Sequence, residues 1–91
     1  MTLAVQHLPD QHRFEVVVDG HASFTTYSIA SGVLTIIHTE VPPELGGRGI
    51  AGALVQAALD HARDTGLKVR PACSYSRAYM ERHPETLSLL A

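Results

Sequence analysis

The sequence predicts a single α+β domain, in which a four-stranded antiparallel meander precedes a crossover helix, a fifth strand and a second helix. The first observation is that short apolar or alternating segments, separated by turn residues, fill residues 3–41, a pattern typical of hairpin-connected strands. The second is an apolar stripe at helical spacing over residues 50–65, followed by another strand-like segment. A strand that follows a crossover helix lies parallel to the strand before it, so we expect the fifth strand to run parallel to the fourth.

The first four expected strands are residues 3–8, 13–18, 21–29 and 33–41. Pro9-Asp10-Gln11 provides a turn after the first strand, and Asp19-Gly20 is a strong signal for a two-residue hairpin. Ala30-Ser31-Gly32 forms the next turn. The β-branched apolar residues of Val33–Val41 indicate a central strand, and Pro42-Pro43 ends it because proline cannot donate to a ladder.

The expected crossover helix spans Ile50–Thr65, because its apolar residues recur at i, i+4 spacing. Gly66 is a typical residue just past a helix C-terminus. Leu67–Cys73 is the expected fifth strand, and Ser74–Arg82 is the expected second helix, with its first serine as the N-cap. The leucines of the tail Glu85–Ala91 are expected to pack back onto the core.

Composition narrows the class of protein. The chain has 91 residues, which we expect to form one domain over residues 1–91, and 45% of them are apolar. A net charge of −2 without a block of like charges argues against nucleic acid as the main partner. The apolar segments are far shorter than the ~20 residues that span a membrane. The N-terminus lacks signal-peptide features and the single cysteine cannot form an internal disulfide, so we expect a cytoplasmic protein.

The glycine-rich turn before the first helix is the most informative segment for function. Four glycines fall within seven residues there, namely Gly46, Gly47, Gly49 and Gly52. Residues without Cβ let backbone N–H groups crowd around an anion, and the helix that follows adds the positive end of its dipole, so this turn is a candidate phosphate or pyrophosphate site. A nucleotide-hydrolysing P-loop is excluded because Ile50 and Ala51, not Lys and Ser or Thr, follow Gly49. The chain is also too short for a doubly wound dinucleotide-binding domain.

This turn resembles the pyrophosphate loop of the GNAT N-acetyltransferase superfamily, whose pattern is Gln/Arg-x-x-Gly-x-Gly/Ala. The segment Gly46-Gly47-Arg48-Gly49-Ile50-Ala51 matches it at every position but the first, where Gly46 has no side chain. Three further segments resemble a minimal subgroup of small acetyl-CoA-binding proteins: Glu40-Val41-Pro42, Pro71-Ala72-Cys73 and Tyr79–Glu85. The sequence leaves no room for the two helices that build the acceptor wall in larger GNAT proteins.

The resemblance implies that the chain binds acetyl-CoA or CoA. The expected cofactor contacts are Val41, Gly46, Gly47, Arg48, Gly49, Ile50, Ala51 and Ser74. It also implies a V-shaped gap between the fourth and fifth strands, which holds the pantetheine arm. Pro71 agrees with such a gap, because a residue without N–H is misplaced in a well-paired central strand. A position at a strand end or edge is the alternative for Pro71.

Acetyl transfer to an amine needs a base for the amine and an acid for the leaving thiolate. The resemblance implies Glu40 as base and Tyr79 as acid; a solvated carboxylate and a tyrosine packed on the core are the structural alternatives. Cys73, at the start of the second helix, is either a nucleophile that accepts acetyl or a small buried residue. Ser74 and Tyr75 are further candidates to cap this helix and line the pocket.

The six histidines do not predict a metal site, since none lies at H-x-H or H-x-x-x-H spacing. His38 shares a strand face with Glu40 and is expected to tune that carboxylate or to contact an acceptor. Two functions stay open: an acetyl-CoA-dependent N-acetyltransferase for a small amine or a protein, and a CoA-binding module without turnover. Glu40, Cys73 and Tyr79 favour the first, whereas the missing helices and Gly46 favour the second.

Overall fold

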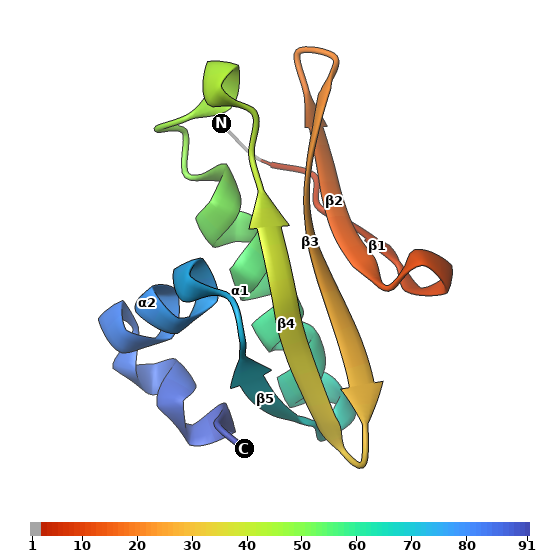
Figure 1. Cartoon of the computed structure of the whole chain (residues 1–91), viewed down its shortest axis with the longest axis vertical. Helices are drawn as coiled ribbons and strands as arrows, with labels where there is room; N and C mark the ends of the chain where they lie inside the picture. The colour runs from red at the N-terminus through yellow and green to blue at the C-terminus, as the bar shows by residue number, and fades with distance from the viewer. Residues whose placement is uncertain (1–2) are drawn as a thin grey trace.

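The computed structural model describes residues 3–91 and folds them into one five-stranded sheet with the order β1-β2-β3-β4-β5 (Figure 1). The strands are β1 (Gln6–Leu8), β2 (Arg13–Val18), β3 (His21–Ala30), β4 (Val33–Glu40) and β5 (Lys68–Pro71). The first four are antiparallel neighbours, and β5 pairs in parallel with β4. The expected meander with a parallel fifth strand is therefore confirmed.

The α-helices are α1 (Ile50–Thr65) and α2 (Ser74–Arg82), and short 3₁₀ helices form η1 (Pro9–Gln11), η2 (Pro43–Leu45) and η3 (Pro84–Leu89). Both α-helices have the limits that the sequence predicts. Gly66 ends α1 with a φ of 76°, and its amide reaches the carbonyls of the last turn, which is the left-handed cap that glycine adopts without strain. Within residues 3–91, no helix is long and apolar enough to cross a membrane.

The β2–β3 and β3–β4 hairpins each turn on two residues that have positive φ. Asp19 and Gly20 have φ of 51° and 77°, and Ser31 and Gly32 repeat these values. Such turns match the right-handed twist of the strands that they join. The β2–β3 turn is the expected one, whereas the β3–β4 turn is one residue shorter than expected because Ala30 still pairs with Val33.

Several expected limits differ from the structure. β1 starts at Gln6 rather than residue 3, and β5 ends at Pro71 because the amides of Ala72 and Cys73 both donate to the carbonyl of Ile36. The expected N-cap, Ser74, is instead the first residue of α2. Cys73 is the N-cap, and its sulfur accepts from the amide of Ser76. The tail packs back only in part: Leu89 contacts the core, whereas Leu87 and Leu90 are 40% and 42% exposed.

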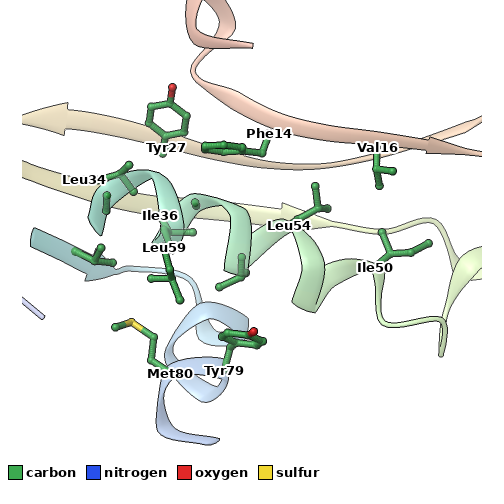
Figure 2. Close-up of a cluster of buried hydrophobic side chains, with 14 of the residues drawn as sticks. Phe14, Val16, Tyr27, Leu34, Ile36, Ile50, Leu54, Leu59, Tyr79 and Met80 are labelled. Carbon is green, nitrogen blue, oxygen red and sulfur yellow. The ribbon is translucent and has the colours of Figure 1, made fainter. Parts of the chain in front are cut away.

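The core lies between α1 and one face of the sheet (Figure 2). Phe14, Val16 and Tyr27 from the sheet meet Leu54 and Leu59 of α1 there. α2 contributes Tyr79 and Met80 to the same core (Figure 2) and packs against α1, β4 and β5. Alternate residues of β2 and β3 point to the opposite face, which no helix within residues 3–91 covers, and Val17 on that face is 61% exposed.

Candidate active site

The glycine-rich loop joins β4 to α1 and is shaped by prolines and glycines. Leu45, in η2, is buried at 1% exposure and anchors the start of the loop. Gly47 and Gly49 have φ of 80° and 76°, a region in which an L-residue is strained. Gly49 is the N-cap of α1, so no side chain satisfies the first amides of the helix. These amides, with the positive end of the helix dipole, can bind an anion.

An open pocket of about 270 Å³ lies over this loop. Its lining residues are Val41, Leu45, Gly46, Gly47, Gly49, Ile50, Ala51 and Tyr75. Most of the cofactor contacts expected from the sequence are therefore brought together, and Leu45 and Tyr75 join them. Arg48 and Ser74 are not among the lining residues. Arg48 instead points to the β2–β3 turn, where its Nη1 lies 3.0 Å from the Oδ2 of Asp19.

A second open pocket of the same volume lies beside the C-terminal half of α1, where Tyr27 and His61 are among its lining residues. Its lining residues include no glycine and no residue at the N-terminus of an α-helix. We therefore place the candidate anion site at the glycine loop, where backbone donors converge.

The ladder between β4 and β5 stops short of this loop. Its last pair is Ile36 with Pro71, and over the rest of β4, through Glu40, only β3 supplies partners within residues 3–91. Pro71 thus stands at the last pair of the ladder, and the expectation that β5 diverges from β4 is confirmed. β4 also carries a bulge there, because His38 and Ile36 face neighbouring residues of β3 and Ile37 is extra.

Polar side chains lie where the pairing between β4 and β5 has ended, which we call the gap between these strands. The Sγ of Cys73 accepts from the amide of Ser76 at 3.3 Å and donates to its Oγ at 3.0 Å. Across the gap, the Oγ1 of Thr39 lies 3.7 Å from this sulfur and 2.9 Å from the Oγ1 of Thr25. Cys73 is therefore held by three hydroxyl or amide contacts where the strands diverge. Thr39 was not singled out from the sequence, because the bulge at Ile37 decides which face it occupies.

Glu40 and His38 lie together on the open face of the sheet. The Nε2 of His38 is 3.5 Å from the Oε1 of Glu40, and their side chains are 56% and 61% exposed. Glu40 directly precedes Val41, which lines the loop pocket. The exposed carboxylate of Glu40 matches the solvated alternative given for it, and its neighbour His38 lies on the same face as expected; the role of Glu40 as a base stays a prediction.

The two tyrosines of α2 occupy different environments. Tyr79 is 8% exposed, and its hydroxyl donates to the Oε1 of Gln56 on α1 at 2.5 Å. Burial, followed by the nearby phenol of Tyr75, raises the pKa of Tyr79. Tyr75 lines the loop pocket, and its Oη lies 3.3 Å from where a Cβ on Gly52 would stand. Gly52 and Gln56 are one turn apart on α1, as are Tyr75 and Tyr79 on α2, so the two helices pack turn against turn.

Gly52 lies within α1 rather than in the loop, and this helix packing explains why a glycine stands there. A side chain there would crowd the hydroxyl of Tyr75 and contact the ring of Tyr79, whose Cε2 is 3.4 Å from the Cβ position. The matching i, i+4 spacing of the two pairs is the sequence signal that could have predicted the contact. Within residues 3–91, no group of three or more His, Cys, Asp or Glu side chains is arranged to hold a metal ion.

Comparisons with known proteins agree with this geometry. The family model described as GCN5-related N-acetyl-transferase matches residues 13–89. Protein NATD1 from Mus musculus is 32% identical over 85 residues, which cover 90% of this chain and 77% of the relative. Protein NATD1 from Homo sapiens is 32% identical and covers 90% of this chain and 75% of the relative.

A solved structure shares the fold. The solution NMR structure of a GCN5-like protein from Staphylococcus aureus superposes with a TM-score of 0.78 at 26% sequence identity. The match covers 98% of this chain and 88% of that one. The resemblance noted in the loop thus extends over nearly the whole chain. From the family model, the relatives and the shared fold, the chain belongs to the GCN5-related N-acetyltransferase family.

Proposed function

We propose that residues 1–91 form a single acetyl-CoA-dependent N-acetyltransferase domain, which works in the cytoplasm and moves acetyl to an amine of a small molecule or a protein. One observation carries the proposal: the β4–β5 ladder ends at Ile36 and Pro71, next to a glycine loop that opens a helix. A gap between strands and an anion site at its rim suit a long cofactor with a phosphate at one end.

The residues of the loop fit acetyl-CoA. Its pyrophosphate would lie on the amides of Gly47–Ala51, and its pantetheine arm would lie between β4 and β5, bonded to backbone near Val41. A Cβ on Gly47 or Gly49 would meet no atom of residues 3–91 within 4 Å, so the space above the loop is free for a ligand. When bound, acetyl-CoA supplies an electrophilic thioester carbonyl.

Side chains of the protein would carry out the two proton transfers of the reaction. Glu40, with His38 beside it at 3.5 Å, would take the proton from the attacking amine, directly or through water. A tyrosine of α2 would return a proton to the leaving thiolate. The sequence points to Tyr79 for this role, but its hydroxyl is bonded to Gln56, whereas Tyr75 lines the pocket. We therefore propose Tyr75 as the acid and Tyr79 as the residue that fixes α2 against α1.

Two variants distinguish these roles. Tyr75→Phe should lower kcat by roughly 10²-fold or more, the usual effect of losing a positioned acid, while leaving the melting temperature nearly unchanged. Tyr79→Phe should lower the melting temperature, because Gln56 loses a buried partner, and should change kcat less. The reverse pattern would return the acid role to Tyr79.

Direct transfer is favoured over a route through the thiol of Cys73. Its sulfur contacts hydroxyl and amide groups of Ser76 and Thr39, and within residues 3–91 no histidine is hydrogen-bonded to it. A thiol nucleophile is usually activated by an adjacent base. Mass spectrometry after incubation with acetyl-CoA tests this directly, since an acetyl group on Cys73 during turnover would establish the covalent route.

The second candidate function is a CoA-binding module without turnover. The uncovered face of the sheet beside Glu40 favours it, because no helix within residues 3–91 forms an acceptor wall. Gly46 also favours a binding module without turnover, since it lacks the Gln or Arg side chain found at this position of the loop pattern. Calorimetric titration with acetyl-CoA, followed by release of free CoA with a panel of amino acids, polyamines and lysine peptides, separates the two. Binding without acetylation of any amine supports the module, and absence of binding overturns both.

A further inference from the structure

Arg48 is the only lysine or arginine between Glu40 and Leu54, the segment that would surround the cofactor phosphates. Its guanidinium does not point over the loop pocket. Instead, Nη1 lies 3.0 Å from the Oδ2 of Asp19, a residue 29 positions earlier in the chain. Guanidinium groups bind phosphates through paired N–H donors. The guanidinium of Arg48, which is the cationic group of this segment best suited to bind a phosphate, is therefore paired with the carboxylate of Asp19.

The turn that carries Asp19 is held in place by the sheet. Asp19 and Gly20 form the two-residue turn between β2 and β3, with both φ values positive, and this turn type fixes the direction of the hairpin tip. A second contact joins the same tip to the segment before the loop: the Nδ1 of His21 lies 3.8 Å from the Oε2 of Glu44. The hairpin thus contacts the chain on both sides of Gly46 and Gly47.

The Arg48–Asp19 pair is weak enough to exchange. The side chains are 42% and 68% exposed, and exposed ion pairs are screened by solvent and salt. A pyrophosphate carries more negative charge than one carboxylate and adds the loop amides as donors, so it competes well for the same guanidinium.

We propose that Asp19 is a built-in competitor for the cofactor phosphates. In the free protein Asp19 binds Arg48, and when the pyrophosphate occupies the loop, Arg48 leaves Asp19 and bonds to phosphate. The proposal rests on the proposed function, since it names a further binding residue of the same site. Asp19 then lowers the affinity for CoA and makes it dependent on salt, without contacting the cofactor itself.

The test is calorimetry of CoA, dephospho-CoA and pantetheine with the wild type and with Asp19→Asn. Asparagine suits this turn type as well as aspartate does, so the hairpin is kept. Asp64→Asn is the matched control, because Asp64 is also 68% exposed and paired with an arginine, but on α1 near its C-terminus. Asp19→Asn should tighten CoA and dephospho-CoA binding by about twofold to fivefold at low salt, and Asp64→Asn should not.

Three further results define the outcome. The gain in CoA affinity caused by Asp19→Asn should shrink at about 0.5 M salt. No gain should be seen for pantetheine, which has no phosphate. The gain should also vanish when Arg48→Gln is combined with Asp19→Asn. If the wild type binds CoA but Asp19→Asn binds it equally or more weakly, the competition is overturned while the proposed function stands. If the wild type binds neither CoA nor dephospho-CoA, the proposed function itself is overturned.

Discussion

Replacing Gly49 by alanine separates the cost of backbone strain from the cost of blocking the cofactor. Gly49 and Gly66 bracket α1 and both have φ of 76°. A Cβ at either would meet no atom of residues 3–91 within 4 Å. An L-residue in this region costs roughly 1–2 kcal/mol, so Gly49→Ala and Gly66→Ala should each lower the melting temperature by about 4–16 °C for a domain of this size.

Only the Gly49 variant should affect the cofactor. Gly49 lines the pocket over the loop, where the phosphates are proposed to lie, and a Cβ there would stand in open space, whereas Gly66 is at the other end of the helix. Inserting a methyl group into a packed contact costs about 1–3 kcal/mol, which corresponds to acetyl-CoA binding that is roughly fivefold to 150-fold weaker. Calorimetric titration of both variants gives the comparison. Equal affinities, with equal losses of melting temperature, would refute the placement of the pyrophosphate on this loop.

Two further predictions concern the chemistry and the response to pH. Glu40→Gln should lower kcat by roughly 10²–10⁴, the usual contribution of a positioned base, whereas Cys73→Ala should keep most turnover; an amine identified as substrate and acetylated at an unchanged rate by the Glu40 variant would remove that residue from the mechanism. Burial, with a smaller effect of His61, lowers the pKa of His7 below 6.5. As the pH falls, His7 is protonated in the unfolded chain before it is protonated in the folded chain, which favours unfolding. The stability that comes from neutral His7 is therefore complete above about pH 6.5 and is lost as the pH falls further. Thermal melts between pH 5 and 8 should show this loss in the wild type and a smaller one in His7→Gln, and the same slope in both proteins would contradict it.

The open face of the sheet sets the character of the site. Glu40 and His38 lie on this face with more than half of each side chain exposed. An acceptor would therefore meet the proposed base from solvent rather than inside a closed pocket. This geometry places few steric limits on the size of the acceptor, and it is the reason to include lysine peptides with small amines in the turnover assay.

Local sequence patterns determined the elements of this fold. The i, i+4 stripe and the flanking glycines gave α1 its correct limits, because helix periodicity and caps are short-range properties. Asp19-Gly20 predicted the β2–β3 turn for the same reason. Pro71 predicted where β5 stops pairing with β4, since a missing N–H is a property of one residue that no packing can restore.

Contacts between distant segments were decided only by the tertiary structure. The resemblance pointed to Tyr79 as the acid, with Tyr75 one turn before it on α2 as a candidate to line the pocket. The packing of α2 on Gly52 and Gln56 of α1 turns one ring toward the loop pocket and buries the other.

The tertiary structure also decided the partner of Arg48 and the residue that caps α2. Arg48 was expected at the cofactor, but the β2–β3 hairpin brings Asp19 to it from 29 residues away. Ser74 was expected to cap α2, yet Cys73 is the N-cap because the end of β5 and the carbonyl of Ile36 set where the chain turns. Residue type and spacing specify which groups are present near a site, whereas the direction of each side chain depends on which neighbouring element fills the space beside it.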